Sequence, residues 1–233
     1  MRIVLKLSGE VLKGNKESGL CPETCRALSK AIRSLSSEGV QIGLVIGGGN
    51  IYRGEESKEI GMDRVPADYM GMLATLLNGL SLQHFFSEVG LKSHVFSGLD
   101  CPKAVETYNA AKARLRLEEG GVCIFVGGTG NPFFTTDSAA ALRAAEIHAD
   151  LLLKGTKVDG VYDKDPMLHA DAKRYEKISY DRVLEENLRV MDATSFALCR
   201  AQKIPMCVFA MDLLLKGGKI TLEELKQSGT FID

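Results

Sequence analysis

The sequence predicts an α/β fold, a three-layer sandwich in which a mainly parallel central sheet carries helices on both faces. The first observation behind this prediction is that short apolar runs alternate with helix-like segments along the chain. The second is that Val40 to Ile46 is an apolar, partly β-branched run, which is consistent with a buried strand. The third is that the N-terminal residues form a strand, helix, strand unit, which implies parallel pairing and a right-handed crossover.

This first unit begins with a strand expected over Arg2 to Leu7 and broken at Ser8-Gly9. Pro22 suits the first turn of the following helix, because proline has no backbone N–H to donate. Gly39 is expected to end that helix, and Val40 to Ile46 follows as the second strand. The apolar face of the helix is expected to consist of Leu28, Ile32 and Leu35.

The pattern then recurs to the end of the chain. We expect a long helix from Pro66 to Gly90, and an alanine-rich helix from Pro102 that stops at Gly120-Gly121. Further helices are expected over Asp137 to Ala149 and over about 181–188 and 192–203, whereas residues 157–180 read as irregular. Strands are expected at Ser93–Phe96, Val122–Val126 and Met206–Phe209, and the helix that begins at Asp137 runs into Leu151-Leu152-Leu153. No linker interrupts the sequence, so residues 1–233 are predicted to form a single domain.

Composition narrows the function classes. The 233 residues are 45% hydrophobic and 25% charged, which is ordinary for a globular protein, and no run of about 18 apolar residues predicts a membrane span. The first residues lack the apolar core of a signal peptide, so we expect a cytoplasmic protein whose six cysteines are reduced. A formal net charge of −1 gives no field that would attract nucleic acid.

Glycine-rich turns follow three of the predicted strands. They are Ser8-Gly9, Gly47-Gly48-Gly49-Asn50 with Arg53 close behind, and Gly127-Gly128-Thr129-Gly130. Glycine lets backbone N–H groups approach an anion, and ligands of open α/β sheets bind beyond the carboxyl ends of the strands. One such cluster alone is more often a tight turn, but three clusters, two of them near Lys6 or Arg53, favour a phosphate site. Neither a GxxxxGK[ST] loop nor a GxGxxG after the first strand is present.

Three charged residues near these turns have a structural and a chemical interpretation. Lys6 could extend its ammonium group past an apolar stem, or it could bind a phosphate. Asp137 and Asp192 each precede or begin a predicted helix, so each could be an N-cap. A carboxylate at a strand end could also hold a cation, and the two roles are compatible.

These residues together resemble the bacterial UMP kinases of the amino acid kinase family, over nearly the whole chain. The most specific segment is Gly128 to Asp137, which reads GTGNPFFTTD. The other matching segments are Lys6-Leu7-Ser8-Gly9-Glu10, Gly47-Gly48-Gly49-Asn50 with Arg53, Asp68 before Met70-Gly71-Met72-Leu73-Ala74-Thr75, Lys154 to Tyr162 with Asp165-Pro166, and Val190-Met191-Asp192.

The resemblance implies an enzyme that transfers the γ-phosphoryl group of ATP to UMP, with Mg²⁺ bound mainly through the ATP phosphates. It implies that the N-terminal part mainly holds UMP and the part from about residue 150 mainly holds ATP. The implied catalytic residues are Lys6, Arg53, Asp137 and Asp192, the two aspartates organising Mg²⁺ or the lysine. The implied ATP-binding residues are Lys6, Leu7, Ser8, Gly9, Gly49, Arg53, Thr156, Tyr162 and Asp165. The implied UMP-binding residues are Gly48, Asp68, Thr129, Gly130, Asn131, Pro132, Phe133, Phe134, Thr135 and Thr136.

The resemblance also implies a homohexamer that UTP inhibits. The loop Gly14 to Gly19 is less glycine-rich than the segment that relatives use in GTP activation, so a response to GTP is left open. Two other functions are weighed against this one. The first is another small-molecule kinase of the same fold, acting on a carboxylate or carbamate, for which Asp68 and the Thr129–Thr136 segment would have no purpose. The second is a non-catalytic nucleotide sensor or storage protein, for which Lys6 and Asp137 would not be needed.

Overall fold

The computed structural model describes residues 1–53, 60–188 and 190–233. Within these ranges, one sheet of nine strands has the order β4-β3-β5-β2-β1-β6-β10-β11-β9, and β7 and β8 form a separate ribbon. The strands are β1 (Arg2–Leu7), β2 (Gln41–Ile46), β3 (Ser93–Ser97), β4 (Glu106–Thr107), β5 (Val122–Val126), β6 (Leu151–Thr156), β7 (Val161–Tyr162), β8 (Arg174–Tyr175), β9 (Lys177–Ile178), β10 (Met206–Ala210) and β11 (Thr230–Ile232). In the main sheet only the β10–β11 pair is antiparallel among the described residues, which confirms the mainly parallel sheet.

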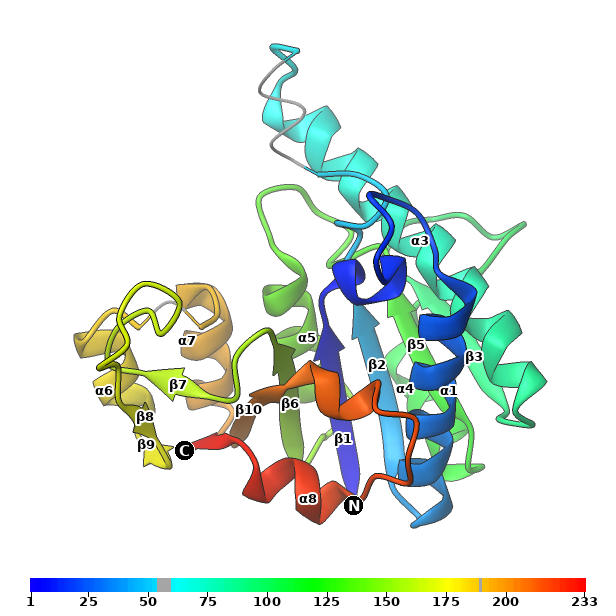
Figure 1. Ribbon diagram of the computed structural model, residues 1–233. Coiled ribbons are helices and arrows are strands. Elements are labelled where there is room, and N and C mark those ends of the chain that lie inside the picture. The colour runs from blue at the N-terminus through cyan, green and yellow to red at the C-terminus, as the bar shows by residue number, and fades with distance from the viewer. Residues whose placement is uncertain (54–59, 189) are drawn as a thin grey trace.

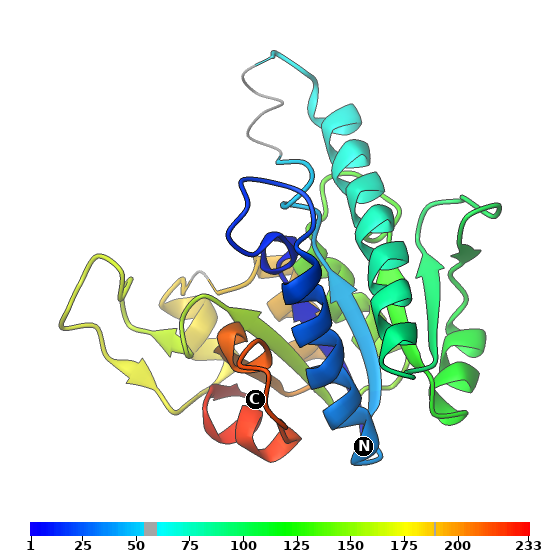
Figure 2. The same ribbon diagram turned by 45° about the vertical axis from the view of Figure 1, so that its right-hand side comes forward.

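Helices cover both faces of this sheet, as the sequence predicts. They are α1 (Pro22–Ser37), α3 (Arg64–Glu88), α4 (Ala110–Glu118), α5 (Thr136–Glu146), α6 (Tyr180–Glu185), α7 (Ala193–Ala201) and α8 (Leu222–Gln227), with 3₁₀ turns η1 (Gly9–Lys13) and η2 (Met211–Leu214). Figures 1 and 2 show α1 and α3 on one face of the sheet and α5 on the other. None of the helices among the described residues is long and apolar enough to cross a membrane.

The alternation of side chains along β1 supplies both cores. Ile3, Leu5 and Leu7 pack with α1 and α3, whereas Val4 packs with the alanines of α5. Lys6 follows Val4 by two residues, so it lies on the α5 face of the sheet. The small side chains Ala140, Ala141 and Ala144 line the buried face of α5, which lets its backbone approach the strands closely. The sequence therefore directs Lys6 toward the start of α5.

Two expectations from the sequence are wrong. Residues after Pro102 form turns and the short strand β4, and the helix α4 begins only at Ala110. Its N-cap is Asn109, whose side chain accepts a hydrogen bond from the Lys112 N–H, and this cap decides where the helix starts. Residues 157–180 contain three short strands, β7, β8 and β9, rather than irregular chain alone.

The sequence analysis also missed the C-terminal elements. The strand β11 pairs antiparallel with β10 and parallel with β9, which extends the sheet beyond the last strand that was expected. The two halves of the chain therefore occupy different sides of β1. Strands β2 to β5 lie on one side, and β6 with the later strands lies on the other.

Two glycines of α3 allow a matched test of how tightly this helix packs. A Cβ on Gly79 would lie 2.4 Å from Cγ1 of Val126 in β5, whereas a Cβ on Gly71 would meet nothing within 4 Å. We expect Gly79→Ala to lower the free energy of unfolding by about 1–3 kcal/mol, because overpacking outweighs the gain in helix propensity. Gly71→Ala should raise it by about 0.5–1 kcal/mol. Urea unfolding of both variants measures the difference, and equal effects would contradict the close packing of α3 on β5.

Candidate active site

Two lysines and one carboxylate form a buried cluster at the carboxyl edge of the sheet. Lys6 of β1 and Lys154 of β6 are register partners on adjacent parallel strands. Nζ of Lys6 lies 2.7 Å from Oδ1 of Asp137, and Nζ of Lys154 lies 2.6 Å from Oδ2 of the same carboxylate. Lys154 also donates to the backbone carbonyl of Val190. A single aspartate at the start of α5 therefore holds both ammonium groups.

The cluster carries more positive than negative charge. Burial lowers the pKa of Lys154, and the neighbouring Lys6 lowers it further, while the carboxylates of Asp137 and, to a smaller extent, Asp192 oppose both effects. Two ammonium groups share one carboxylate, so a further anion at this point would be stabilised. The electrostatics of the cluster thus suit an anionic ligand such as a phosphate.

Asp192 connects the first turns of α5 and α7. It is the N-cap of α7, and its Oδ1 accepts from the backbone N–H and the hydroxyl of Ser195, each at 2.8 Å. Its Oδ2 accepts from the hydroxyl of Thr135 and, at 2.9 Å, from that of Ser138. Burial opposes the charge, but these hydrogen bonds outweigh it and keep the pKa of Asp192 below its ordinary value. The structure thus assigns Asp192 a capping contact, with both oxygens engaged.

The turn after β1 is in close backbone contact with the turn after β2. A Cβ on Gly9 would lie 2.3 Å from the carbonyl oxygen of Gly47, so only glycine fits there. The N–H of Gly47 donates to the carbonyl of Leu7 at 3.0 Å, and Ser8 caps η1 by accepting from the N–H of Glu10. The Ser8-Gly9 and Gly47-Gly48-Gly49 turns therefore lie side by side.

A cavity of about 180 Å³ opens between the turn after β2, α3 and the start of α5. It brings together Gly48, Gly49, Asp68, Phe134, Thr135 and Thr136 from the predicted set. Tyr52, Ala67, Gly71, Met72, Thr75 and Gly128 complete its lining. Because Thr136 precedes Asp137, this cavity adjoins the lysine cluster.

The exposed loop before α5 is fixed by Asp68. Its Oδ2 accepts from the backbone N–H of Phe133 at 2.7 Å and lies 3.4 Å from Nε of Arg64, whose guanidinium covers the Phe133 ring. Phe133 has a φ of 72°, an uncommon conformation for a residue with a side chain. Thr129, Gly130, Asn131, Pro132 and Phe133 do not line the cavity itself. In the structure Asp68 therefore orders this loop as well as lining the cavity.

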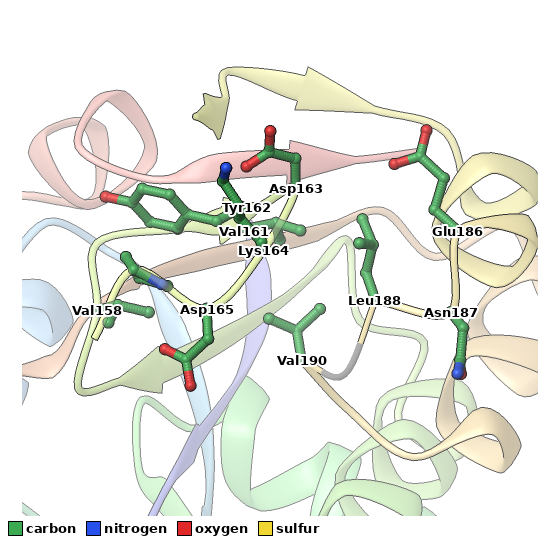
Figure 3. Close-up of a pocket in the computed structure, with 12 residues that line it drawn as sticks. Val158, Val161, Tyr162, Asp163, Lys164, Asp165, Glu186, Asn187, Leu188 and Val190 are labelled. Atoms are coloured by element: carbon green, nitrogen blue, oxygen red, sulfur yellow. The ribbon is translucent and has the colours of Figure 1, made fainter. Parts of the chain in front are cut away.

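A second cavity has a volume of about 510 Å³. It is lined by residues 158 and 160–166 together with Glu186, Asn187, Leu188 and Val190 (Figure 3). Tyr162 and Asp165 of the predicted set belong to this lining, whereas Thr156 does not. The carbonyl of Val190 accepts from Lys154, so this cavity also adjoins the lysine cluster.

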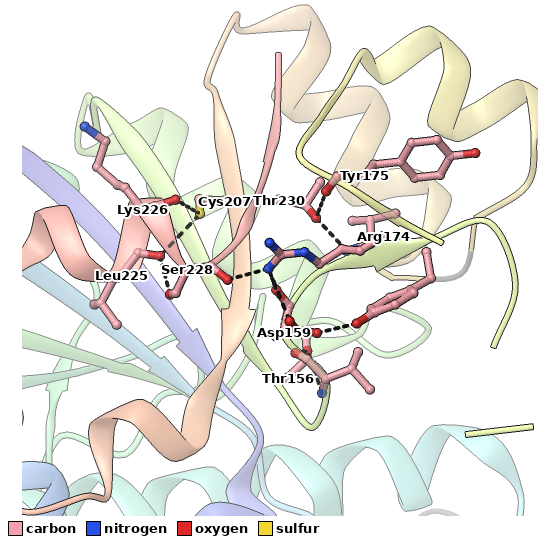
Figure 4. Close-up of polar contacts among 12 residues, drawn as sticks. Thr156, Asp159, Arg174, Tyr175, Cys207, Leu225, Lys226, Ser228 and Thr230 are labelled. Atoms are coloured by element: carbon pink, nitrogen blue, oxygen red, sulfur yellow. Dashed lines mark hydrogen bonds and ion pairs between the residues drawn. The ribbon is translucent and has the colours of Figure 1, made fainter. Parts of the chain in front are cut away.

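The chain end holds the ribbon that borders the second cavity. Arg174 of β8 donates to the carbonyls of Asp159 and Ser228, at 3.1 and 2.7 Å (Figure 4). The hydroxyl of Thr230 accepts from the N–H of Val161 at 2.9 Å and donates to the carbonyl of Tyr175. These bonds tie both strands of the β7–β8 ribbon to the segment that leads into β11.

Arg53 and Thr156 of the predicted set line neither cavity. Nη2 of Arg53 is 3.1 Å from Oε1 of Glu10, and Nε donates to the carbonyl of Gly49 at 3.4 Å. Glu10 also lies 3.4 Å from the Nζ of Lys157, so one carboxylate holds two exposed cations next to the glycine turns. The hydroxyl of Thr156 is used by the neighbouring Val158 backbone.

The sequence analysis assigned no role to Lys154, which it named only within a matching segment, or to Arg143. Lys154 follows Leu151-Leu152-Leu153 as Lys6 follows Ile3-Val4-Leu5, and this parallel was the available signal. Arg143 is buried in α5, where it covers the Tyr108 ring, pairs with Glu146 and donates to the carbonyl of Gly128 at 3.2 Å. Nothing in its sequence surroundings distinguishes it from an exposed helix arginine.

The described residues contain no group of three or more His, Cys, Asp and Glu side chains that could hold a metal ion. Asp137 is the carboxylate that contacts both lysines, through Oδ1 at 2.7 Å from Lys6 and Oδ2 at 2.6 Å from Lys154. Mg²⁺ at phosphoryl-transfer sites is commonly held by one or two carboxylates together with phosphate oxygens and water. The donor set therefore fits an ion that arrives with a phosphate ligand.

Comparisons with known proteins agree on one family. Residues 1–210 match the model of the amino acid kinase family. The uridylate kinase of Protochlamydia amoebophila is 54% identical over 232 residues, which cover 100% of this chain and 92% of that relative. The uridylate kinase of Psychrobacter cryohalolentis is 50% identical over 212 residues, which cover 91% of this chain and 88% of that relative.

Solved structures give the same answer for the fold. The UMP kinase of Ureaplasma parvum superimposes with a TM-score of 0.88 at 40% identity, covering 100% of this chain and 98% of that one. The UMP kinase of Bacillus anthracis superimposes with a TM-score of 0.91 at 32% identity, covering 100% of this chain and 95% of that one. These likenesses confirm the expected three-layer α/β architecture.

Two aspartates that pair with lysine, one buried and one exposed, test how much the buried cluster contributes to stability. Asp137 and its lysines are 10–13% exposed, whereas Asp171, at 2.5 Å from Nζ of Lys164, is 77% exposed. We expect Asp137→Asn to lower the free energy of unfolding by about 3–5 kcal/mol, because it leaves two buried cations unpaired. Asp171→Asn should change it by less than about 1 kcal/mol.

Urea unfolding at neutral pH measures both effects. Adding Lys154→Met to Asp137→Asn should restore part of the lost stability, because it removes one of the unpaired charges. Equal losses in the two single variants, or no recovery in the double variant, would contradict the shared-carboxylate interpretation.

Proposed function

This chain belongs to the amino acid kinase family, and from that premise we propose that it is a UMP kinase. The reaction is the reversible transfer of the γ-phosphoryl group of ATP to UMP, giving ADP and UDP, a step of pyrimidine nucleotide synthesis. The observation that carries the proposal is the Lys6–Asp137–Lys154 cluster, which adjoins one cavity through Thr136 and another through Val190. A phosphoryl donor and an acceptor can thus approach the same two cations.

The chemistry needs positioning and charge neutralisation more than covalent help. A phosphate oxygen of UMP forms a bond to the γ-phosphorus, and the bond from that phosphorus to the bridging oxygen of ADP breaks. The attacking oxygen is already ionised, so no side chain has to remove a proton. Lys6 and Lys154 are suited to stabilise the negative charge on the transferring oxygens, and Asp137 keeps both in place.

Mg²⁺, when bound with ATP, neutralises charge on the β- and γ-phosphates. Asp137 is the side chain we propose to hold it, with a carboxylate that it would share with Lys6 and Lys154. Backbone N–H groups of the glycine turns and of the first turn of α5 are suited to the remaining phosphate oxygens. Asp192 acts indirectly, because its oxygens bind the hydroxyls at the starts of α5 and α7.

We assign UMP to the cavity lined by Asp68 and Thr136, and ATP to the cavity lined by Tyr162 and Asp165. Every residue of the first lining precedes residue 150, and every residue of the second follows it. This division supports the expectation that the two halves of the chain hold different nucleotides. Arg53 and its partner Glu10 lie next to Gly49, where the guanidinium could swing toward a bound phosphate. The predicted cytoplasmic compartment is consistent with both substrates.

The outer face of α3 supports the proposed homo-oligomer. Met70, Leu73, Leu77 and Leu80 are all more than a third exposed and follow one another at spacings of three, four and three residues. This is the spacing of a seam between two packed helices, and the cavity beside it is lined almost entirely by apolar side chains. A second copy related by a two-fold axis would present the same seam. We propose that such dimers assemble into a hexamer.

An assay of ADP formation tests the proposed function. With ATP and Mg²⁺, we expect rapid turnover with UMP, lower activity with CMP, dUMP or AMP, none with carbamate or glutamate analogues, and inhibition by UTP. Turnover of a carboxylate or carbamate in place of UMP would favour the other small-molecule kinases of the family. Tight nucleotide binding without any turnover would favour a sensor.

A lysine variant tests the cluster within the same assay. Lys6→Ala should lower kcat by about 100-fold or more, because it removes charge stabilisation that matters most in the transition state. Lys112 of α4, an exposed lysine paired with Glu106, provides the control, and Lys112→Ala should leave kcat unchanged. A near-normal kcat for Lys6→Ala would reject its role.

Light scattering coupled to size exclusion tests the assembly. We expect the mass of a hexamer for the wild type and a smaller species for the double variant Leu73→Glu with Leu77→Glu, because charges would be buried in the seam. Leu115→Glu, at an equally exposed leucine of α4, should leave the mass unchanged. A monomeric wild type, or an unchanged mass for the double variant, would contradict the proposed interface.

A further inference from the structure

The inner face of α3 carries two polar residues in an otherwise apolar contact with the sheet. Thr75 is 2% exposed and Asn78 is fully buried, and they lie one helical turn apart on the same face. Buried polar groups are costly unless they are hydrogen-bonded, so their partners indicate why such residues stand here. In both cases the partner is a glycine turn at the carboxyl edge of the sheet.

Thr75 holds the turn after β5. Its hydroxyl accepts a hydrogen bond from the N–H of Gly127 at 2.7 Å and donates to the carbonyl of Met72 in its own helix at 2.6 Å. Gly127 has a φ of 71°, a conformation that takes the chain out of the strand and into the Gly128–Thr136 loop. The direction in which this loop leaves β5 thus depends on a hydroxyl group of α3.

Asn78 holds the turn after β2. Its Nδ2 donates to the carbonyl of Gly47 and to Oδ1 of Asn50, both at 2.7 Å, and its Oδ1 accepts from Nδ2 of Asn50 at 3.0 Å. Asn50 in turn donates to the carbonyl of Gly19 at 2.8 Å. The amide pair therefore fixes both ends of the Gly47–Asn50 turn and attaches the preceding loop to it.

The two turns belong to neighbouring strands, because β2 and β5 are paired in the sheet. One rigid helical turn of α3 spans the gap between them, and Gly79 packs against Val126 closely enough to prevent the helix from sliding. We propose that Thr75 and Asn78 are positioning residues for UMP. Thr75 holds the turn that leads into Gly128, and Asn78 holds the turn of Gly48 and Gly49, all of which line the cavity assigned to UMP. This inference rests on the proposed function.

A purely structural role predicts a different result. If the two residues only stabilised the fold, removing either would lower thermal stability and change the binding of both nucleotides to a similar extent. A positioning role predicts a split, in which both variants weaken UMP binding and spare ATP binding, because the two turns border the UMP cavity and not the ATP cavity. The buried hydroxyl of Ser29 in α1 is a matched control, because within the part of the chain that the structure describes it bonds only to the carbonyl of Cys25 in its own helix.

The experiment measures KM, kcat and calorimetric Kd for UMP and for ATP in wild type, Thr75→Val, Thr75→Ser, Asn78→Leu and Ser29→Ala. We expect Thr75→Val to raise the Kd for UMP by about tenfold, since it leaves the Gly127 N–H without an acceptor. The Kd for ATP should stay within about twofold of the wild-type value. Thr75→Ser should restore UMP binding, and Asn78→Leu should weaken UMP binding more than ATP binding. Hydrogen exchange at the Gly127 amide should accelerate in Thr75→Val alone, which a direct contact of the hydroxyl with UMP would not cause.

Turnover of UMP by the wild type decides the proposed function before any variant is compared. The binding ratios then decide the inference, because calorimetry reports on each nucleotide whether or not the variant turns over. Equal changes for UMP and ATP in both variants, or changes in Thr75→Val that match those in Ser29→Ala, would overturn it. If Asn78→Leu fails to fold, Asn50→Ala removes the same amide pair from the turn and should give the same split.

Discussion

The candidate site at the carboxyl ends of the strands depends on one constraint: two buried ammonium groups must be kept beside each other. Lys6 and Lys154 face the same layer because each follows an apolar residue of that face by two positions on adjacent parallel strands. Without Asp137 they would repel each other in a site that water reaches poorly. The Asp137 carboxylate makes the arrangement possible. It balances only one of the two ammonium charges, so a bound anion can neutralise the other.

The surrounding elements serve to hold backbone turns around this charge. Helix α3 binds the turns after β2 and β5 from one face of the sheet, and Arg143 of α5 binds the carbonyl of Gly128 from the other. Asp192 joins the starts of α5 and α7, and Arg174 with Thr230 attaches the β7–β8 ribbon to the end of the chain. The site is therefore built from rigid helices and strands, with short glycine turns between them.

Much of this could be predicted from the sequence, and the failures have physical reasons. Lys6 and the glycine turns were visible because a strand ending in lysine and glycine is an unusual local pattern. Lys154 has the same pattern, but its importance arises from the β1–β6 pairing, which no local signal specifies. The expected helix after Pro102 failed because Asn109 supplies a stronger cap, and the roles of Asn78 and Arg143 depend on partners 31 and 15 residues away.

The most direct measurement of the central claim is the pKa of Lys154, followed by the ¹³Cε resonance of its side chain in the free and ATP-bound protein. The account predicts a pKa below the ordinary lysine value in the free protein, since burial and Lys6 disfavour the charged form, and a rise when ATP adds negative charge. A lysine that titrates normally and does not respond to ATP would show that the cluster is not the phosphate-binding centre.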